Sequence, residues 1–269
     1  MFASTFTSGS KHRRGEIILL LAALSAAVPL AAARAEGCAF ALQGEGRVAE
    51  IVDGRSFRLT DGREIRLAGI EPVRSATAAI DGTAVLTSIL AGQDVTLRGA
   101  DDAPDRYGRQ AAFVFLASSD ALVQGLLLAQ GAALVSADIA DKGCEGILMQ
   151  TEADARKVKK GLWNASGVIK NAEIPDDILA GIGQFAVVEG KVLSVRQAGT
   201  TTYLNFGRNW GRGFAVTISR RTMPAVESAG LALKSLENRR IRVRGWVESR
   251  GGPRIELLRA DQLEVLDVN

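Results

Sequence analysis

The sequence predicts a mainly β (α+β) protein built from two small barrels. Three features of the 269 residues carry this prediction. Apolar and polar residues alternate over many short segments, which is typical of half-buried strands. Asp-Gly pairs separate the first of these segments, and such a pair is a strong hairpin signal. A run of strands interrupted by one helical segment then occurs in each half of the chain. The hydrophobic content of 47% is enough for one or two domains with cores of their own.

The first three strands are expected within residues 43–67. The stretches "GRVAEIVDG", "SFRLTDG" and "EIRLAGI" alternate strongly, and turns are expected at Asp53-Gly54 and Asp61-Gly62. Two consecutive hairpins therefore begin the first barrel.

Five further segments complete the first half of the chain. They are a helix-like stretch weakened at its centre by Asp81-Gly82, two strands, and two helices that stop at Gly131 and Gly161. In chain order they span residues 76–90, 94–99, 111–116, 121–130 and 144–160. Five strands that wrap into a barrel with flanking helices predict an OB-fold.

The second half is expected to be all β. Residues 164–183 are polar with scattered Gly and Pro, so we interpret them as a linker. Five strands follow, with a short helical piece at 226–236 between the third and the fourth. The strands span residues 185–196, 201–207, 214–220, 239–249 and 254–260. The domains predicted are 36–163, an OB-fold with helices, and 184–269, a smaller OB-like β-barrel.

Residues 1–35 have the pattern of a secretory signal peptide. A basic segment around Arg13 precedes an apolar run at 17–32, and a small-x-small site lies at 33–35. The prediction is an exported protein, periplasmic or secreted. The alternative is an uncleaved membrane anchor, although the run is short for a span and contains Pro29. No second apolar stretch is long enough to cross a bilayer.

Cleavage of this leader would change the chemistry available to the chain. It would remove His12, the only histidine, and leave 29 basic and 29 acidic residues with no net charge. A chain without histidine has no Ser-His-Asp triad, no Cys-His pair, no histidine base and no His-ligated zinc.

The two cysteines, Cys38 and Cys144, predict one disulfide, because an exported chain meets an oxidising compartment. The bond would tie the start of the mature chain to the first domain. It would close a long loop, for which the chain-entropy model gives about 4 kcal/mol of stabilisation.

Four motifs in order give the first half a resemblance to a known family. They are "VDGRSFRL" at 52–59, "RLAGIEPVR" at 66–74, "DRYGR" at 105–109 and "EADARKVKKGLW" at 152–163. Over residues 46–163 the chain resembles the staphylococcal-nuclease (thermonuclease) family. The resemblance implies an OB-fold and the hydrolysis of phosphodiesters with calcium.

The family's site residues carry over only in part. The resemblance makes Arg66 and Arg109 the two arginines that hold the phosphate, catalytic if the protein is active. Arg55 and Glu71 stand where the family has its two aspartate ligands of calcium, and Arg74 stands where it has the glutamate that orients or activates water. Glu71 is thus the only acidic ligand position retained.

Arginine at a calcium-ligand position predicts the loss of the metal. A guanidinium cannot ligate a cation, and two like unit charges about 4 Å apart repel by roughly 4 kcal/mol at an effective dielectric constant of 20. Calcium takes six to eight oxygen ligands, several of them carboxylates. No cofactor is therefore expected, and calcium only if the protein is active.

The four arginines 55, 66, 74 and 109 are expected around one cleft, where they favour phosphate because guanidinium donors match its oxygens. Under the alternative interpretation they form ordinary surface ion pairs with Glu64, Glu71 and Asp105. Both interpretations remain open from the sequence.

The second half offers aromatic residues among arginines. The candidate nucleic-acid-binding residues are Tyr203, Trp210, Arg212, Arg242 and Arg244. On an OB-fold, exposed aromatics stack bases while arginines follow the backbone. We expect the two arginines of "RIRVRGW" on an exposed basic face, with Gly245 as a possible bulge. The alternative is that Trp210 and Trp246 belong to the core.

Charge is divided between the halves. Residues 184–269 have a net charge of +6, whereas residues 36–183 have −6. Such an asymmetry is typical of a chain that binds a polyanion, although two opposite domains could also attract each other. The expected function is an exported nuclease-like protein that binds single-stranded DNA, RNA or another phosphate polymer without efficient hydrolysis. The alternatives are an active metal-dependent phosphodiesterase and an interaction scaffold of the cell envelope.

Overall fold

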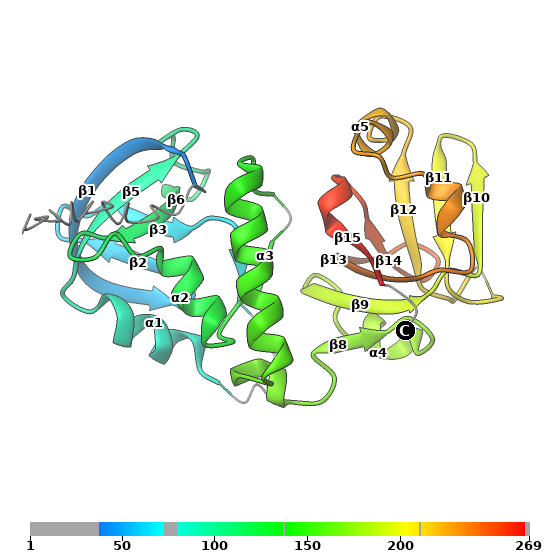
Figure 1. The fold of residues 1–269 in the computed structure, drawn as a ribbon, viewed down its shortest axis with the longest axis horizontal. Coiled ribbons are helices and arrows are strands. Elements are labelled where there is room, and N and C mark those ends of the chain that lie inside the picture. The colour runs from blue at the N-terminus through cyan, green and yellow to red at the C-terminus, as the bar shows by residue number, and fades with distance from the viewer. Residues whose placement is uncertain (1–37, 73–79, 137, 210, 267–269) are drawn as a thin grey trace, which may run out of the picture. The chain divides into compact units, whose positions relative to one another are not determined.

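The computed structural model describes residues 38–72, 80–136, 138–209 and 211–266, and most of their regular structure is β (Figure 1). Residues 35–269 form one unit by their contacts. The predicted leader lies outside the described residues. Among the helices that are described, none is long and apolar enough to cross a membrane.

Five strands of the first half close into a barrel. In spatial order they are β1 (Ala41–Asp53), β2 (Ser56–Leu59), β3 (Glu64–Leu67), β6 (Arg109–Leu116) and β5 (Asp94–Gly99). The long strand β1 pairs with β5 along its first part and with β2 along its second part. Strands β3 and β6 run parallel, and the other neighbours are antiparallel. The predicted five-stranded barrel is confirmed.

The two Asp-Gly hairpins form as expected because each aspartate caps its own turn. The Asp53 carboxylate accepts the backbone N–H of Arg55 at 2.9 Å, and Asp61 accepts that of Arg63 at 3.0 Å. Such Asx turns fix the chain direction locally. The first of them places Arg55 just before β2.

The first helix differs from the prediction. Asp81 was expected to weaken the centre of a helix over 76–90, but α1 (Gly82–Leu90) begins directly after it. The Asp81 carboxylate accepts the N–H groups of Thr83 and Ala84, at 2.9 and 3.3 Å. It is therefore an N-cap, the role for which a short acidic side chain is best suited. Residues 76–79 lie outside the described residues.

Helices α2 (Val123–Ala129) and α3 (Lys142–Lys157) pack against each other beside the barrel, and the short 3-10 helix η1 (Gly161–Asn164) follows them. Gly131 and Gly161 both have positive φ, and a Cβ on Gly131 would lie 2.2 Å from the Lys160 carbonyl oxygen. Only glycine allows this close approach. The predicted disulfide is present: Cys38, ahead of β1, is bonded to Cys144 in α3.

The second half forms an eight-stranded sheet, where five strands were predicted. The strands are β8 (Ile169–Asn171), β9 (Phe185–Lys191), β10 (Ser194–Ala198), β11 (Thr201–Asn205), β12 (Ala215–Ser219), β13 (Arg240–Ser249), β14 (Pro253–Glu256) and β15 (Leu263–Leu266). Between β12 and β13 lie α5 (Met223–Ser228) and the 3-10 helix η2 (Leu233–Leu236), and the 3-10 helix η3 (Ala260–Gln262) precedes β15.

The second sheet repeats the connectivity of the first barrel. Only two residues separate β9 from β10, so the two can be taken as one bent strand. The spatial order of the strands is then the same as in the first barrel, and the parallel pair of β12 with β14 corresponds to the pair of β3 with β6. In the second half a helix follows the third strand of this order, β12, and in the first half α1 follows β3 after the short strand β4 (Ile70–Glu71). This connectivity is similar to that of an OB-fold, with β8 and β15 added at the margin of the sheet.

The segment interpreted as a linker contributes to this sheet. Within residues 164–183, β8 pairs in parallel with β9, and α4 (Pro175–Leu179) follows it. The exact domain boundaries therefore stay a prediction. A small apolar cluster joins the two sheets through β7 (Leu134–Val135), α3, η1 and β9; it contains Leu134, Ala155, Leu162, Trp163 and Val187.

Candidate functional site

Three short strands bring an arginine pair and a glutamate together. Arg55 precedes β2, Arg66 lies in β3, and Glu71 ends β4 (Ile70–Glu71), which pairs with β7. The Leu67 N–H donates to the Arg55 carbonyl at 2.8 Å, so the hairpin backbone holds the two arginine segments side by side.

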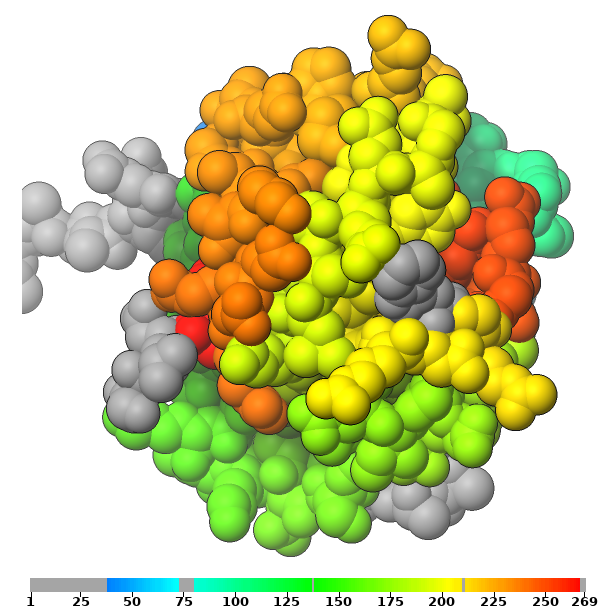
Figure 2. Space-filling view, turned by 90° about the vertical axis from the view of Figure 1, so that its right-hand side faces the viewer, coloured from blue at the N-terminus to red at the C-terminus, as the bar shows by residue number. Residues whose placement is uncertain are grey.

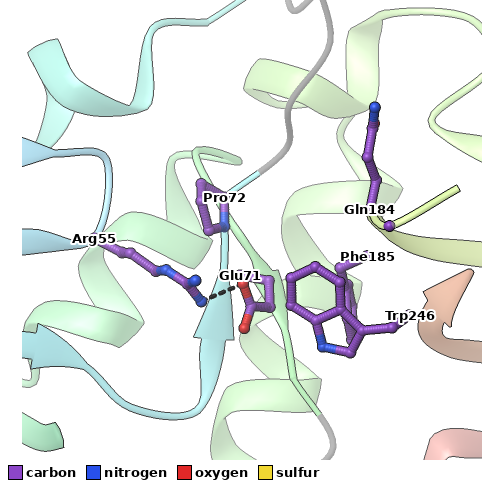
Figure 3. Close-up of a pocket in the computed structure, with 7 residues that line it drawn as sticks. Arg55, Glu71, Pro72, Gln184, Phe185 and Trp246 are labelled. Carbon is purple, nitrogen blue, oxygen red and sulfur yellow. Dashed lines mark hydrogen bonds and ion pairs between the residues drawn. The ribbon is translucent and has the colours of Figure 1, made fainter. Parts of the chain in front are cut away.

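The Glu71 carboxylate accepts hydrogen bonds from both guanidinium groups. Its Oε2 is paired with Nη1 of Arg55 (Figure 3), and its Oε1 lies 3.3 Å from Nη2 of Arg66. The side chains of Arg55 and Glu71 are 11% and 8% exposed, whereas that of Arg66 is 28% exposed. The bond to Arg66 is longer than the 2.7–2.9 Å usual for a charged pair, so Glu71 holds Arg66 less firmly.

Arg109 adds a third guanidinium to this surface. Arg109 lies opposite Glu64 in the parallel pair of β6 with β3, and Ala111, two residues further on, lies opposite Arg66. Because side chains alternate along a strand, Arg66 and Arg109 share one face of the barrel. Asp105 accepts both Nε and Nη2 of Arg109, at 3.0 and 2.7 Å.

The pKa values of Arg66 and Asp105 reflect the high density of positive charge at this surface. Burial lowers the pKa of Arg66, and the charges of Arg55 and Arg109 lower it further, while Glu71 and Asp105 act in the opposite direction. The hydrogen bonds from Arg109 lower the pKa of Asp105 to about 2. Three arginines thus share two directly paired carboxylates, and an anion placed here would relieve their mutual repulsion.

The sequence identifies the fold that carries this arrangement. Residues 64–165 match the family model described as staphylococcal nuclease homologue, from β3 to the end of η1. This part of the chain is therefore similar to a staphylococcal nuclease domain, and we call the half of the chain that contains it the nuclease domain. The match covers less than half of the chain, and no curated protein matches it. Arg66, Glu71 and Arg109 lie inside the matched range of the nuclease domain, and Arg55 lies just before it.

The residues of the nuclease domain do not fit the calcium ion typical of the family. Calcium requires six to eight oxygen ligands, and both oxygens of Glu71 face guanidinium groups. Within the ranges that the structure describes, no cluster of three or more Asp, Glu, His or Cys residues could hold a metal. Asp53, another acid of the hairpin, accepts the backbone N–H of Arg55.

Both interpretations of the arginines find support in these contacts. The ion pairs with Glu71 and Asp105 are present, while Glu64 pairs with Arg58 at 3.2 Å instead. At the same time Arg55, Arg66 and Arg109 do lie around one surface of the nuclease domain. Arg74 falls outside the described residues.

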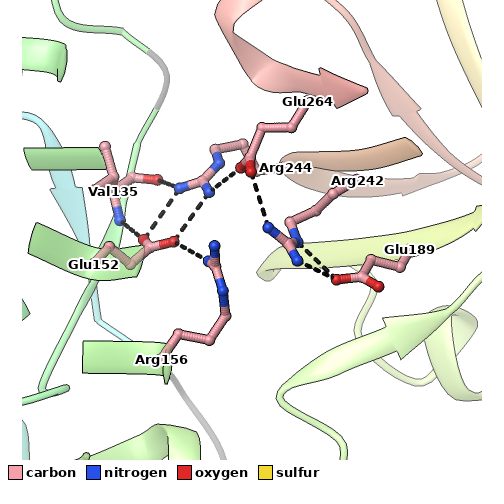
Figure 4. Close-up of polar contacts among 7 residues, drawn as sticks. All are labelled: Val135, Glu152, Arg156, Glu189, Arg242, Arg244 and Glu264. Atoms are coloured by element: carbon pink, nitrogen blue, oxygen red, sulfur yellow. Dashed lines mark hydrogen bonds and ion pairs between the residues drawn. The ribbon is translucent and has the colours of Figure 1, made fainter. Parts of the chain in front are cut away.

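The expectation of an exposed basic face on β13 is wrong. The side chain of Arg244 is 1% exposed and that of Arg242 is 12% exposed. Arg244 contacts Glu152 of α3 at 3.0 Å and Glu264 at 2.8 Å (Figure 4). Arg242 lies 2.6 Å from Glu189.

The physical reason is that this face of β13 meets the nuclease domain. Ile241, Val243 and Val247 point into the core of the second sheet. The alternate residues Arg242, Arg244 and Trp246 therefore point to the other side. There Glu152 of α3 contacts Arg244, and Glu189 and Glu264 contact Arg242. Burial alone would lower the pKa of Arg244, but Glu152 and Glu264 outweigh it and raise that pKa.

Gly245 is not a bulge, because β13 pairs with β9 in unbroken register from Arg240 to Trp246. A Cβ on Gly245 would lie 2.6 Å from Ile255, which explains the glycine. Trp246 is 48% exposed and does not belong to the core. Its ring contacts that of Phe185 edge to face, with the ring centroids 6.0 Å apart.

The other candidates of the second half are scattered. Tyr203 is half-buried in β11, Arg212 is exposed in the loop before β12, and Trp210 lies outside the described residues. A shallow hollow of about 400 Å³ lies between β10 and the α5–η2 segment. Figure 2 shows this face, where the segments around β10 (yellow-green) and η2 (orange) lie next to each other.

Two features of the site were not predicted. The first is Tyr107, which is 65% exposed and lies under the guanidinium groups of Arg106 and Arg109, at 4.8 and 4.9 Å. An aromatic residue between two arginines in "DRYGR" was a signal for it. The second is a cavity of about 170 Å³ lined by Arg55, Glu71 and Pro72 on one side and by residues of the second half on the other. No local sequence pattern predicts a cavity that is formed by segments so far apart in the sequence.

Proposed function

We propose that the chain binds single-stranded nucleic acid, or another phosphate polymer, through Arg55, Arg66 and Arg109, and does not hydrolyse it efficiently. The observation that carries the proposal is the pairing of Glu71, at a metal-ligand position of the nuclease domain, with two guanidinium groups. The nuclease domain itself supports a nuclease-like function.

Binding follows from the excess of positive charge. Guanidinium groups offer forked donors that match two phosphate oxygens, and they do so more strongly where water is partly excluded. Arg66 and Arg109 are 28% and 24% exposed, so a ligand can reach them without unfolding the hairpin. A phosphate beside Arg66 would replace its long bond to Glu71 and lower the repulsion from Arg55.

Weak hydrolysis follows from the same contacts. The family's chemistry needs a cation beside the phosphate and a glutamate near the attacking water. Arg55 stands at the first position, where it would repel a divalent ion, and arginine 74 stands at the second in the sequence. We also propose export, supported by the leader-like residues 1–35 and by the Cys38–Cys144 disulfide, since such bonds persist in oxidising compartments.

One assay separates the proposal from its alternatives. The unit 35–269 is mixed with a single-stranded oligonucleotide that carries a fluorophore and a quencher. Anisotropy measures binding before calcium is added, and a rise in fluorescence measures cleavage afterwards. We expect salt-sensitive binding without cleavage. Reversing the charge of Arg66 and Arg109 should abolish binding, and the exposed control Arg47→Ala should leave it unchanged.

Two outcomes would replace the proposal. Cleavage that a chelator stops and that Arg66→Ala abolishes would show an active metal-dependent phosphodiesterase with ligands elsewhere. Absence of binding to every oligonucleotide at low salt would favour the interaction scaffold of the cell envelope. Each variant's far-ultraviolet circular dichroism verifies that the barrel is intact.

A further inference from the structure

We infer that the cavity between Glu71 and Trp246 is a subsite for one unpaired nucleobase of the bound strand. The inference rests on the proposed function, and it narrows the ligand from any phosphate polymer to single-stranded nucleic acid. Its walls come from both halves of the chain: Arg55, Glu71 and Pro72 from the nuclease domain, and Gln184, Phe185 and Trp246 from the second sheet (Figure 3).

The cavity lies at the open end of the face where the second sheet meets the nuclease domain. Along β13, Arg242, Arg244 and Trp246 all point to this face. The side chains of Arg242 and Arg244 are buried there, with 12% and 1% of their surface exposed, whereas Trp246 is 48% exposed. The contact between the halves therefore ends at the tryptophan, and it leaves a hollow that the Arg55–Glu71 pair closes on the far side.

The aromatic wall of this cavity is fixed in place. Trp246 and Phe185 are partners in the register of β13 with β9, and their rings meet at 77°. Beyond that pair the backbone continues to be held, because Gly183 donates to Val247 and Val247 donates to Gln184, both at 2.9 Å. A rigid ring that is half-exposed can stack a base without losing conformational entropy on binding.

Polar residues also line the cavity, among them Gln184, whose amide extends away from the rings in Figure 3. Gln184 is exposed and carries both a donor and an acceptor on its amide. Pro72 supplies an apolar wall opposite the rings. The volume of about 170 Å³ is roughly ten times the 10–15 Å³ that a cavity needs to hold one water molecule, which is room for a single ring system.

Arg55 connects this cavity to the phosphate-binding arginines. It lines the cavity and also shares Glu71 with Arg66. When a phosphate of a nucleic-acid strand lies on Arg66 and Arg109, the cavity with its aromatic wall is therefore adjacent to that strand. A base in a duplex is paired and stacked and could not enter, so the arrangement selects a single strand.

The test compares two ligands that share a backbone. The unit 35–269 is titrated with a short oligothymidylate and with an abasic deoxyribose-phosphate strand of the same length. We expect Trp246→Ala to weaken binding of oligothymidylate by about 5- to 150-fold, the effect of removing one stacking partner. It should leave binding of the abasic strand unchanged, and Trp246→Phe should restore most of the loss. Leu258→Ala, at another exposed apolar residue of the second half, is the matched control.

The outcomes distinguish this inference from the function on which it rests. If Arg66→Ala weakens binding of both strands while Trp246→Ala weakens neither, the base subsite is wrong and the phosphate site stands. If Trp246→Ala weakens both strands equally, the tryptophan acts on the fold and the inference is also wrong. If the wild-type unit binds neither strand at low salt, the proposed function fails before the subsite is tested.

Discussion

Among the described residues, two clusters in which one glutamate receives two arginines can be compared, and they differ in burial. Glu71 binds Arg55 and Arg66 at the rim of a cavity. Glu152 binds Arg156 and Arg244 where α3 meets the second sheet, and the side chains of Glu152 and Arg244 are both 1% exposed. The chemistry of the groups is the same. Burial and the surrounding charges decide which cluster is available to a ligand.

The balance of charge separates the two clusters further. At the buried cluster Arg156, Arg242 and Arg244 are matched by three glutamates at positions 152, 189 and 264. The Val135 N–H and carbonyl complete it, with bonds of 2.6 Å to Glu152 and 3.0 Å from Arg244. At the cluster on the rim of the cavity, three arginines share Glu71 and Asp105. Arginine content therefore says little about ligand binding unless the paired acids are considered with it.

The largest expected effect comes from breaking the buried cluster. Arg244→Met leaves Glu152 and Glu264 without their shared partner and should lower the free energy of unfolding by about 3 to 5 kcal/mol. Urea denaturation of the unit 35–269 measures it. The double variant Glu152→Leu/Arg244→Met should recover much of the loss, because the two fully buried charges are then removed together.

The control for that experiment is the more exposed pair of Arg254 with Glu248, whose carboxylate side chain is 48% exposed. Glu248→Gln should cost less than about 1 kcal/mol. If Arg244→Met costs no more than this control, the buried cluster does not hold the two halves together.

Loss of the disulfide should have the second-largest effect on the free energy of unfolding. Replacing both cysteines by serine should lower the free energy of unfolding by about 4 kcal/mol, since the bond closes a loop with a sequence separation of 106. A reducing agent should destabilise the wild-type protein to a similar extent and leave the variant unchanged. A reducing agent that destabilises the variant as well would contradict this assignment.

Removing the acid should tighten binding at the Glu71 cluster but not at the Glu152 cluster. Glu71→Gln leaves three arginines with one paired acid, and we expect binding of a single-stranded oligonucleotide to tighten about fivefold, as one like charge about 4 Å from a phosphate in water is worth about 1 kcal/mol. Glu152→Gln should destabilise the fold without tightening binding. Fluorescence anisotropy at fixed salt measures both, with Glu64→Gln as control. Equal affinity for all three variants would show that the Glu71 cluster is not the binding site.

The smallest effect concerns pH. The folded pKa of Asp105 is about 2, below its ordinary value of 3.8, because Arg109 donates to it. The stabilisation from this pair is therefore present above about pH 4 and is lost as the pH falls toward 2. Carboxyl NMR titration should show the pKa of Asp105 near 2, and near its ordinary value in Arg109→Gln. An unchanged value in the variant would mean that the neighbouring backbone N–H groups set it instead.

Local patterns in the sequence were enough to predict the first barrel, and the presence of only two cysteines was enough to predict the disulfide. Alternation and the Asp-Gly pairs predicted the first three strands because those signals act within a few residues. The nuclease motifs correctly brought Arg55, Arg66 and Glu71 together. Asp81 was misjudged because an acid that weakens a helix interior strengthens a helix start.

Long-range contacts explain what could not be predicted. Alternation in "RIRVRGW" correctly separated two faces of β13, but no local signal shows that α3, about ninety residues earlier, covers the polar face. The cavity with Phe185 and Trp246 depends on the same contact. The prediction assumed that the polar face of β13 is exposed to solvent. In the structure that face contacts α3 through the pair of Arg244 with Glu152.

The pairing of Glu152 with Arg244 has a consequence for synthesis of the protein. The two residues are 92 positions apart, and the arginine is made last. At roughly 5 to 20 residues per second, the ribosome adds Arg244 about 5 to 18 s after Glu152. During that interval Glu152 has only Arg156 and the Val135 N–H as partners, while α3 is already held by its packing against α2. The face of α3 that later contacts β13 therefore stays uncovered until the carboxy-terminal half has been made.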